Sequence, residues 1–303
     1  MELRDRYRGA IIGAAVADAL GQPIEFEVPG SFPPVTGYQA GGTWNLPAGY
    51  WTDDTSLTIC LAESLLAKRG HDPVDQLTRY HRWWRDGENS STGKCFDIGT
   101  TTRTALELFE ASGCPYCGSI RGDRSGNGSL MRLAPVPLYF LNDPATALEM
   151  AEKSSRTTHA SRACLDGCRF WAGLIIGALQ GLSKKEILTP HYSPTNEAND
   201  WCHAIWQVAG GGYQIKGEEL QSTGYVVDTL EVALESFWST SNFRDAVLRA
   251  VNRGGDSDTA SCVCASLAGA YYGFGGIPAE WVTGLHDHAA LLALADRLLA
   301  ERL

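Results

Sequence analysis

Two acidic motifs far apart in the chain constrain its fold most, because each stands at the start of a helical pattern. The first, W-T-D-D-T at 51–55, precedes apolar residues at helical spacing, such as Leu57 and Leu61. The second, G-G-D-S-D-T at 254–259, precedes an apolar run that ends near Gly273. We predict a fold in which these two helix starts meet in space.

Each motif alone has a simpler interpretation. Aspartate often caps a helix, and the helix dipole stabilises acids in the first turn. One cap needs only one carboxylate oxygen, so the second aspartate of each motif is surplus. If the four converge, they repel one another unless a cation neutralises them. Carboxylate and threonine oxygens are the ligands that Mg²⁺, Ca²⁺ or Mn²⁺ prefers. The four aspartates are Asp53, Asp54, Asp256 and Asp258.

The composition is that of a globular protein. The chain has 303 residues, of which 44% are hydrophobic and 20% charged. Its net charge of −10 argues against a general nucleic-acid-binding surface. The apolar runs Ala10–Ala17 and Cys262–Phe274 are shorter than the roughly 20 residues that span a bilayer. The nine cysteines, an odd number, fit reduced thiols better than a disulfide framework. We expect a soluble, cytoplasmic protein without a membrane partner.

Helical spacing recurs along the chain, without a repeat or a convincing alternating strand series. Small residues in the first helix, including Gly9 and Gly13, indicate that another helix crosses it closely, because glycine is costly in a helix. A long loop at 21–49 carries Glu25, and loops of that length are usually functional. We predict an all-α, compact orthogonal multi-helix bundle that forms a single domain over 1–303. The predicted helices are Leu3–Leu20, Thr55–Lys68, Val74–Arg85, Thr100–Ala111, Ser129–Leu141, Ala145–Arg156, Ser161–Gly181, Lys184–Thr189, Thr195–Ala209, Val226–Trp238, Phe243–Val251, Thr259–Gly273 and Ala289–Leu303.

Three further positions are candidates for a site. Asp97 either caps the following helix or faces a ligand. The G-N-G sequence at 126–128 lets backbone N–H groups approach a diphosphate, although any tight turn gives the same pattern. His159 is either a buried structural histidine or a binding residue.

Several blocks of sequence resemble the ADP-ribosylglycohydrolase family, of the dinitrogenase-reductase-activating and ADP-ribosyl-acceptor hydrolase type. They run through nearly the whole chain. The blocks are G-A-I-I-G-A-A-V-A-D-A-L-G-Q-P-I-E at 9–25, W-T-D-D-T-S-L at 51–57, F-D-I-G at 96–99, G-N-G-S-L-M-R at 126–132, T-H at 158–159, Y-V-V-D-T-L at 225–230 and A-V-N-R-G-G-D-S-D-T at 250–259.

The resemblance implies an all-α fold with a centre of two Mg²⁺ ions, or Mn²⁺ in their place. Its implied metal ligands are Thr52, Asp53, Asp54, Asp256, Asp258 and Thr259. Its implied catalytic residues are Glu25, Asp97 and Asp256, with Glu25 as general base or water-positioning group and Asp97 facing the ribose or the leaving group. Its implied substrate-binding residues are Gly99, Gly126, Asn127, Gly128, Ser129, His159 and Tyr225. Tyr225 either stacks on adenine or belongs to the core.

The resemblance also implies hydrolysis of the glycosidic bond between ADP-ribose and an acceptor. An ADP-ribosylated protein side chain is the expected substrate, with arginine favoured over serine, a nucleic-acid base or a small molecule such as O-acetyl-ADP-ribose. The alternative is a non-catalytic sensor of ADP-ribose or a nucleotide, against which the six intact ligands argue.

Two features depart from the family pattern. Arg124-Ser125 stands where some relatives have Ser-Tyr, so contacts on the adenosine side are expected to differ. Cys114-Pro-Tyr-Cys117 looks like the glutaredoxin motif but lies between predicted helices instead of following a strand. We therefore expect hydrolysis to survive Cys114→Ser.

Overall fold

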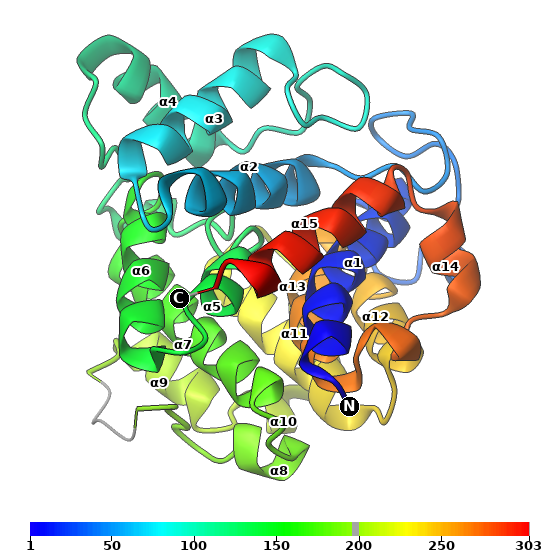
Figure 1. Ribbon diagram of the computed structural model, residues 1–303. Helices are drawn as coiled ribbons and strands as arrows, with labels where there is room; N and C mark the ends of the chain where they lie inside the picture. Colours follow the sequence, from blue (N-terminus) through cyan, green and yellow to red (C-terminus); the bar gives the residue numbers. More distant parts are fainter. Residues whose placement is uncertain (196–199, 303) are drawn as a thin grey trace.

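The computed structural model describes residues 1–195 and 200–302 (Figure 1). This part of the chain forms helices and isolated bridges but no sheet, which confirms the all-α prediction. Within it, no helix is both long and apolar enough to cross a membrane. The helices are α1 (Leu3–Gly21), α2 (Asp53–Lys68), α3 (Pro73–Asp86), α4 (Thr100–Ser112), α5 (Pro135–Tyr139), α6 (Pro144–Arg156), α7 (Arg162–Leu179), α8 (Lys184–Ile187), α9 (His203–Ala209), α10 (Tyr213–Lys216), α11 (Val226–Ser239), α12 (Phe243–Val251), α13 (Ser257–Tyr272), α14 (Ala279–Gly284) and α15 (His288–Ala300).

Helices α1 and α13 cross closely in the core, and α2 lies across one end of the pair (Figure 1). A Cβ atom at Gly9 would lie 2.2 Å from the carbonyl oxygen of Gly269. At the other end of α1, a Cβ atom at Gly21 would lie 2.5 Å from the Cα atom of Asp258. The predicted close crossing is therefore confirmed, and it sets the end of α1 against the start of α13.

A methyl group at this crossing is expected to be strongly destabilising. Gly269→Ala would place its Cβ atom 1.9 Å from the carbonyl oxygen of Gly9, so the two backbones must move apart. We expect a loss of about 3 kcal/mol in the free energy of unfolding, measured by urea denaturation. Gly122→Ala is the matched control, because its Cβ atom would meet nothing within 4 Å. Equal stability of the two variants would contradict the proposed tight crossing.

Two predicted helices were too long and two short helices were missed. Within 129–141, only α5 is helical. Pro135 is its first residue, and because proline has no backbone N–H to donate, a helix that started earlier could not continue through it. The helix predicted over 195–209 exists only as α9, and positions 196–199 lie outside the described residues. The regions that contain α10 and α14 had no predicted helix. Both are too short to show a helical period.

Candidate functional site

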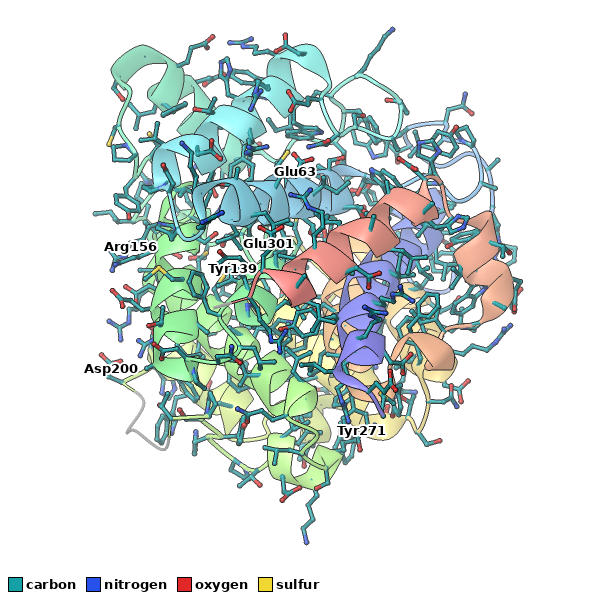
Figure 2. The ribbon with its side chains drawn as sticks, in the orientation of Figure 1. Glu63, Tyr139, Arg156, Asp200, Tyr271 and Glu301 are labelled. Carbon is teal, nitrogen blue, oxygen red and sulfur yellow. The ribbon has the colours of Figure 1, made fainter. Side chains whose placement is uncertain are left out.

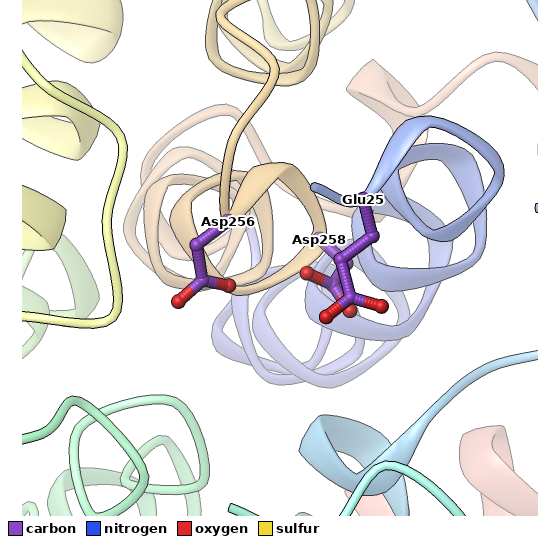
Figure 3. A group of neighbouring side chains, drawn as sticks. All are labelled: Glu25, Asp256 and Asp258. Atoms are coloured by element: carbon purple, nitrogen blue, oxygen red, sulfur yellow. The ribbon is translucent and has the colours of Figure 1, made fainter. Parts of the chain in front are cut away.

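The two acidic motifs meet, together with the loop that follows α1. Glu25, Asp256 and Asp258 each offer a carboxylate oxygen, and these oxygens lie within 4.8 Å of one another (Figure 3). The Oγ1 atom of Thr259 lies 3.3 Å from Oδ2 of Asp54. The Oγ1 atom of Thr52 lies 3.4 Å from Oδ2 of Asp258. The starts of α2 and α13 therefore face each other across one acidic cluster. It consists of Glu25, Asp53, Asp54, Asp256 and Asp258.

The acidic cluster is electrostatically unfavourable as a set of free carboxylates. Burial raises the pKa of Asp53, Asp54 and Asp258 well above the ordinary range, and neighbouring carboxylates raise it further. Burial also raises the pKa of Glu25 to about 8 and that of Asp97 to about 11. The Oδ1 atom of Asp54 is buried without a hydrogen-bond partner among the described residues. These carboxylate oxygens are buried together and their negative charges repel one another, so they form a donor set that fits a hard divalent cation.

Asp18 organises the start of α2 and was not predicted as a site residue. Its Oδ1 atom accepts hydrogen bonds from N and Oγ1 of Thr52, both at 2.9 Å. Its Oδ2 atom accepts from N of Thr55 at 3.0 Å and from Oγ1 at 2.6 Å. Burial raises its pKa to about 6, although all four hydrogen bonds oppose the rise. A single acid inside the apolar run 10–21 was the sequence signal for this residue.

Asp18→Asn is expected to weaken cation binding. An amide cannot accept all four of these hydrogen bonds, so the orientation of Thr52 becomes less fixed. We expect the affinity for Mn²⁺, measured by isothermal titration calorimetry, to fall by roughly 10–100-fold. The matched control is Asp86→Asn at the exposed end of α3. Unchanged Mn²⁺ affinity in folded Asp18→Asn would show that Asp18 has no positioning role.

Two loops dock on each other to bring Glu25 beside the start of α13. The N–H of Phe26 donates to the carbonyl oxygen of Gly255 at 2.7 Å, and the N–H of Gly255 donates to that of Glu27 at 2.8 Å. Gly255 has φ +60°, and a Cβ atom there would lie 2.0 Å from the carbonyl oxygen of Ser222. Only glycine fits this position.

Phe26 has a left-handed backbone, with φ +68°, which is strained for a bulky residue. Its side chain is 61% exposed and lines the cavity beside the acidic cluster. The sequence gives no signal for this conformation, because the docking of Phe26 on Gly255 imposes it.

A cavity of about 260 Å³ opens beside the acidic cluster. The metal-ligand candidates Asp53 and Thr259 also line it. The predicted catalytic and substrate-binding residues that line the cavity are Glu25, Asp97, Asp256, Gly99, Gly126, Asn127, Gly128 and His159.

Asn127 joins the acidic cluster to the turn formed by residues 126–129 (the glycine turn). Its Nδ2 atom donates to Oδ2 of Asp256 at 2.8 Å and to Oγ1 of Thr229 at 2.9 Å. Its backbone N–H donates to the carbonyl oxygen of Gly224 at 3.0 Å. By contrast, no described group accepts a hydrogen bond from the N–H of Gly128 or Ser129. The turn therefore keeps two donors for another acceptor.

His159 is a neutral, buried side chain beside this turn. Burial, and then the charge of Arg132, lower its pKa to about 3. Its Nδ1 atom lies 2.8 Å from Oγ1 of Thr158. A Cβ atom at Gly128 would lie 3.0 Å from Cε1 of His159, so glycine lets the ring pack against the turn.

Two predicted substrate-binding residues are placed differently. The hydroxyl of Ser129 is buried and lies 2.8 Å from that of Ser155. Its backbone N–H has no acceptor among the described residues, although Ser129 is not one of the residues that line the cavity. Tyr225 stands just before α11 and is 41% exposed, which excludes a core role.

Comparisons with known proteins agree with this architecture. Residues 1–303 match the family described as ADP-ribosylglycohydrolase. The chain is 35% identical over 297 residues to the ADP-ribosylarginine hydrolase Tri1 of Serratia proteamaculans (strain 568), covering 98% of this chain and 80% of that one. It is 32% identical to the ADP-ribosyl-[dinitrogen reductase] glycohydrolase of Rhodospirillum rubrum, covering 93% of this chain and 91% of that one. A solved structure titled ADP-ribosylglycohydrolase-related protein complex superposes with a TM-score of 0.89 at 41% identity, covering 100% of this chain and 99% of that one. The chain therefore belongs to the ADP-ribosylglycohydrolase family and is a hydrolase of that family, as its sequence blocks predicted.

Proposed function

We propose that the protein hydrolyses the N-glycosidic bond between ADP-ribose and an arginine side chain of an ADP-ribosylated protein. The observation that carries this proposal is the buried acidic cluster in the wall of a cavity whose other wall is the glycine turn with His159. The names of two relatives support arginine as the acceptor. One is the Serratia protein above, and the other is the ADP-ribosylarginine hydrolase Tri1 of Pseudomonas putida (strain GB-1), which is 37% identical.

We propose that the acidic cluster holds two Mg²⁺ ions, or Mn²⁺ in their place. When bound, such ions polarise ribose hydroxyls and lower the pKa of water. The residues that would hold them are Thr52, Asp53, Asp54, Asp256, Asp258 and Thr259. The unpartnered oxygen of Asp54 and the raised pKa of its neighbours support this assignment.

Glu25 is the residue that we assign to accept the proton of the attacking water. Trp44 Nε1 donates to its Oε2 atom at 2.8 Å and fixes the carboxylate at the cavity wall. Burial raises the pKa of Glu25 to about 8, and a cation bound beside it would lower that pKa again and favour the ionised carboxylate, which is the form that accepts a proton. Asp97 and Asp256 line the same cavity. Once bound cations offset the neighbouring carboxylates that help to raise its pKa, Asp97 can ionise and, with Asp256, is suited to stabilise positive charge that develops on the ribose ring.

The glycine turn is suited to hold the diphosphate of ADP-ribose. The N–H groups of Gly128 and Ser129 have no acceptor among the described residues, and an anion would supply one. His159 is neutral and leaves its Nε2 side toward Gly126 and Gly128, so it adds a polar atom without a charge.

Phe26 is expected to contribute to substrate binding through its exposed ring. A planar substrate group, either the guanidinium or the adenine, gains about 1 kcal/mol or more from such a face. We expect Phe26→Ala to raise KM roughly tenfold with little change in kcat, measured with ADP-ribosylated arginine. Val28→Ala is the control, because this neighbouring side chain is 68% exposed. Equal KM values for the two variants would rule out a contact between Phe26 and the substrate.

The test of the proposed function is the release of ADP-ribose from an arginine-modified protein, with and without EDTA. We expect release that EDTA stops and that added Mg²⁺ or Mn²⁺ restores. Serine-linked, base-linked and acetyl-linked ADP-ribose are tested in parallel to identify the acceptor. Binding of ADP-ribose without release from any acceptor would support the alternative, a non-catalytic sensor.

A further inference from the structure

The loop after α4 carries two cysteines that lie close together at the surface. Cys114 is exposed, whereas Cys117 is 7% exposed. The thiol of Cys117 donates to the carbonyl oxygen of Cys114 at 3.0 Å. Burial, and then the neighbouring Cys114, raise the pKa of Cys117 to about 11. The pair therefore consists of an accessible thiol and a sheltered, protonated one beside it.

The segment from Cys117 to Ser119 is paired with the segment that carries His159. The N–H of Cys117 donates to the carbonyl oxygen of Thr157 at 3.2 Å. The N–H of Gly118 donates at 3.1 Å to the carbonyl oxygen of Arg156, the last residue of α6 (Figure 2). The N–H of Ala160 donates back to Ser119 at 3.0 Å. The segment from Cys117 to Ser119 is therefore hydrogen-bonded to the backbone on either side of His159.

Gly118 makes this pairing intolerant of displacement. A Cβ atom at Gly118 would lie 2.7 Å from the carbonyl oxygen of Arg156 and 2.8 Å from the backbone nitrogen of His159. The two backbones are thus in direct contact, with no side chain between them to absorb a shift.

Cys117 also borders a second cavity, of about 220 Å³, whose lining includes Arg121 and Arg124. Thr101 lines both this cavity and the substrate cavity. The cysteine pair is therefore linked to the substrate cavity by the 156–160 segment and by a shared wall.

We propose that Cys114 and Cys117 are a modification site that closes to a disulfide by exchange with a low-molecular-weight disulfide such as oxidised glutathione. The thiolate of Cys114 attacks one sulfur of the reagent, forming a mixed disulfide and releasing one reduced glutathione. The sulfur of Cys117, after losing its proton to solvent, attacks the Cys114 sulfur and releases the second. Two protein thiols are oxidised and one glutathione disulfide is reduced to two thiols, so electrons and protons balance.

Closure removes the hydrogen bond from Cys117 to Cys114 and pulls the buried sulfur toward the surface. Because the backbones are in contact at Gly118, this strain reaches His159 and the glycine turn. The oxidised protein is therefore expected to bind ADP-ribose several-fold more weakly than the reduced protein. This consequence rests on the proposed function, whereas disulfide formation does not.

The experiment incubates the full-length protein with oxidised glutathione, blocks remaining thiols with iodoacetamide and maps the peptides by mass spectrometry. In the wild type we expect a cross-link between Cys114 and Cys117, reversed by dithiothreitol. Cys117→Ser should stop at a glutathione adduct on Cys114, and Cys114→Ser should form neither product. Cys202→Ser removes another partly exposed cysteine and should behave as the wild type.

Two results would overturn the modification site. One is alkylation of both cysteines in the wild type after incubation, and the other is a wild-type protein that retains a stable glutathione adduct. ADP-ribose affinity is then measured by calorimetry on reduced and oxidised protein. Equal affinities would overturn the coupling to His159, whereas a reduced protein that fails to bind ADP-ribose would count against the proposed function alone.

Discussion

Asp256→Asn is expected to lower kcat/KM for ADP-ribosylated arginine by about a thousandfold or more. Its carboxylate belongs to the acidic cluster and accepts a hydrogen bond from Asn127. If Asp256 is a metal ligand, as proposed, its loss removes several kcal/mol of transition-state stabilisation, and each 1.4 kcal/mol corresponds to roughly tenfold in rate. The measurement is initial-rate kinetics at saturating Mg²⁺.

Two controls separate this loss from misfolding. Asp86→Asn carries the same chemical change at the exposed end of α3 and should keep wild-type kinetics. Asp256→Asn should also retain the wild-type circular dichroism spectrum. A folded Asp256→Asn protein with normal turnover would refute the assignment of Asp256 to the metal centre.

Without a bound cation, the protein is expected to lose stability as pH rises. The folded state raises the pKa of buried carboxyls such as Glu25, to about 8, and Asp97, to about 11. Unfolded carboxyls titrate near about 4, so between about pH 4 and about pH 8 the folded protein binds more protons than the unfolded chain. Stability contributed by these groups is full below the unfolded pKa and is lost as pH rises through the folded pKa.

Urea denaturation of EDTA-treated protein between about pH 7 and about pH 8 gives the cleanest measurement, because ordinary histidines are neutral there. We expect the free energy of unfolding to decrease by at least about 1.4 kcal/mol per pH unit, the slope for one such group. Saturating Mg²⁺ should flatten the slope, because a cation favours the ionised carboxylates. A metal-free protein whose stability is constant or rises over this range would show that folding does not raise the pKa of these carboxyls.

The helices and the two acidic motifs could be predicted because their signals are local. Helical spacing marks α2 and α13, and paired aspartates mark their starts. The role of Asp18 could not be predicted, since its partners Thr52 and Thr55 become neighbours only when α1 and α2 pack. The overlong helix prediction at 129–141 failed because apolar content outweighed the proline signal.

Residue type also did not determine which way a side chain points. Ser129 was predicted as a substrate contact, yet its hydroxyl faces Ser155 and only its N–H remains available. Phe26 had no prediction, because its left-handed backbone depends on a loop that lies far along the chain. The ligand assignments and the catalytic roles stay predictions that the variants above test.

The contact between Gly21 and Asp258 has a consequence for how such a protein can diversify. One acidic motif stands on the same packed crossing as the core, where not even a methyl group fits. Phe26 and Tyr225 are exposed, so packing sets no such limit on the size of the side chain at either position. Substitutions are therefore expected to accumulate at these exposed positions over evolutionary time, whereas the packed start of α13 tolerates very few.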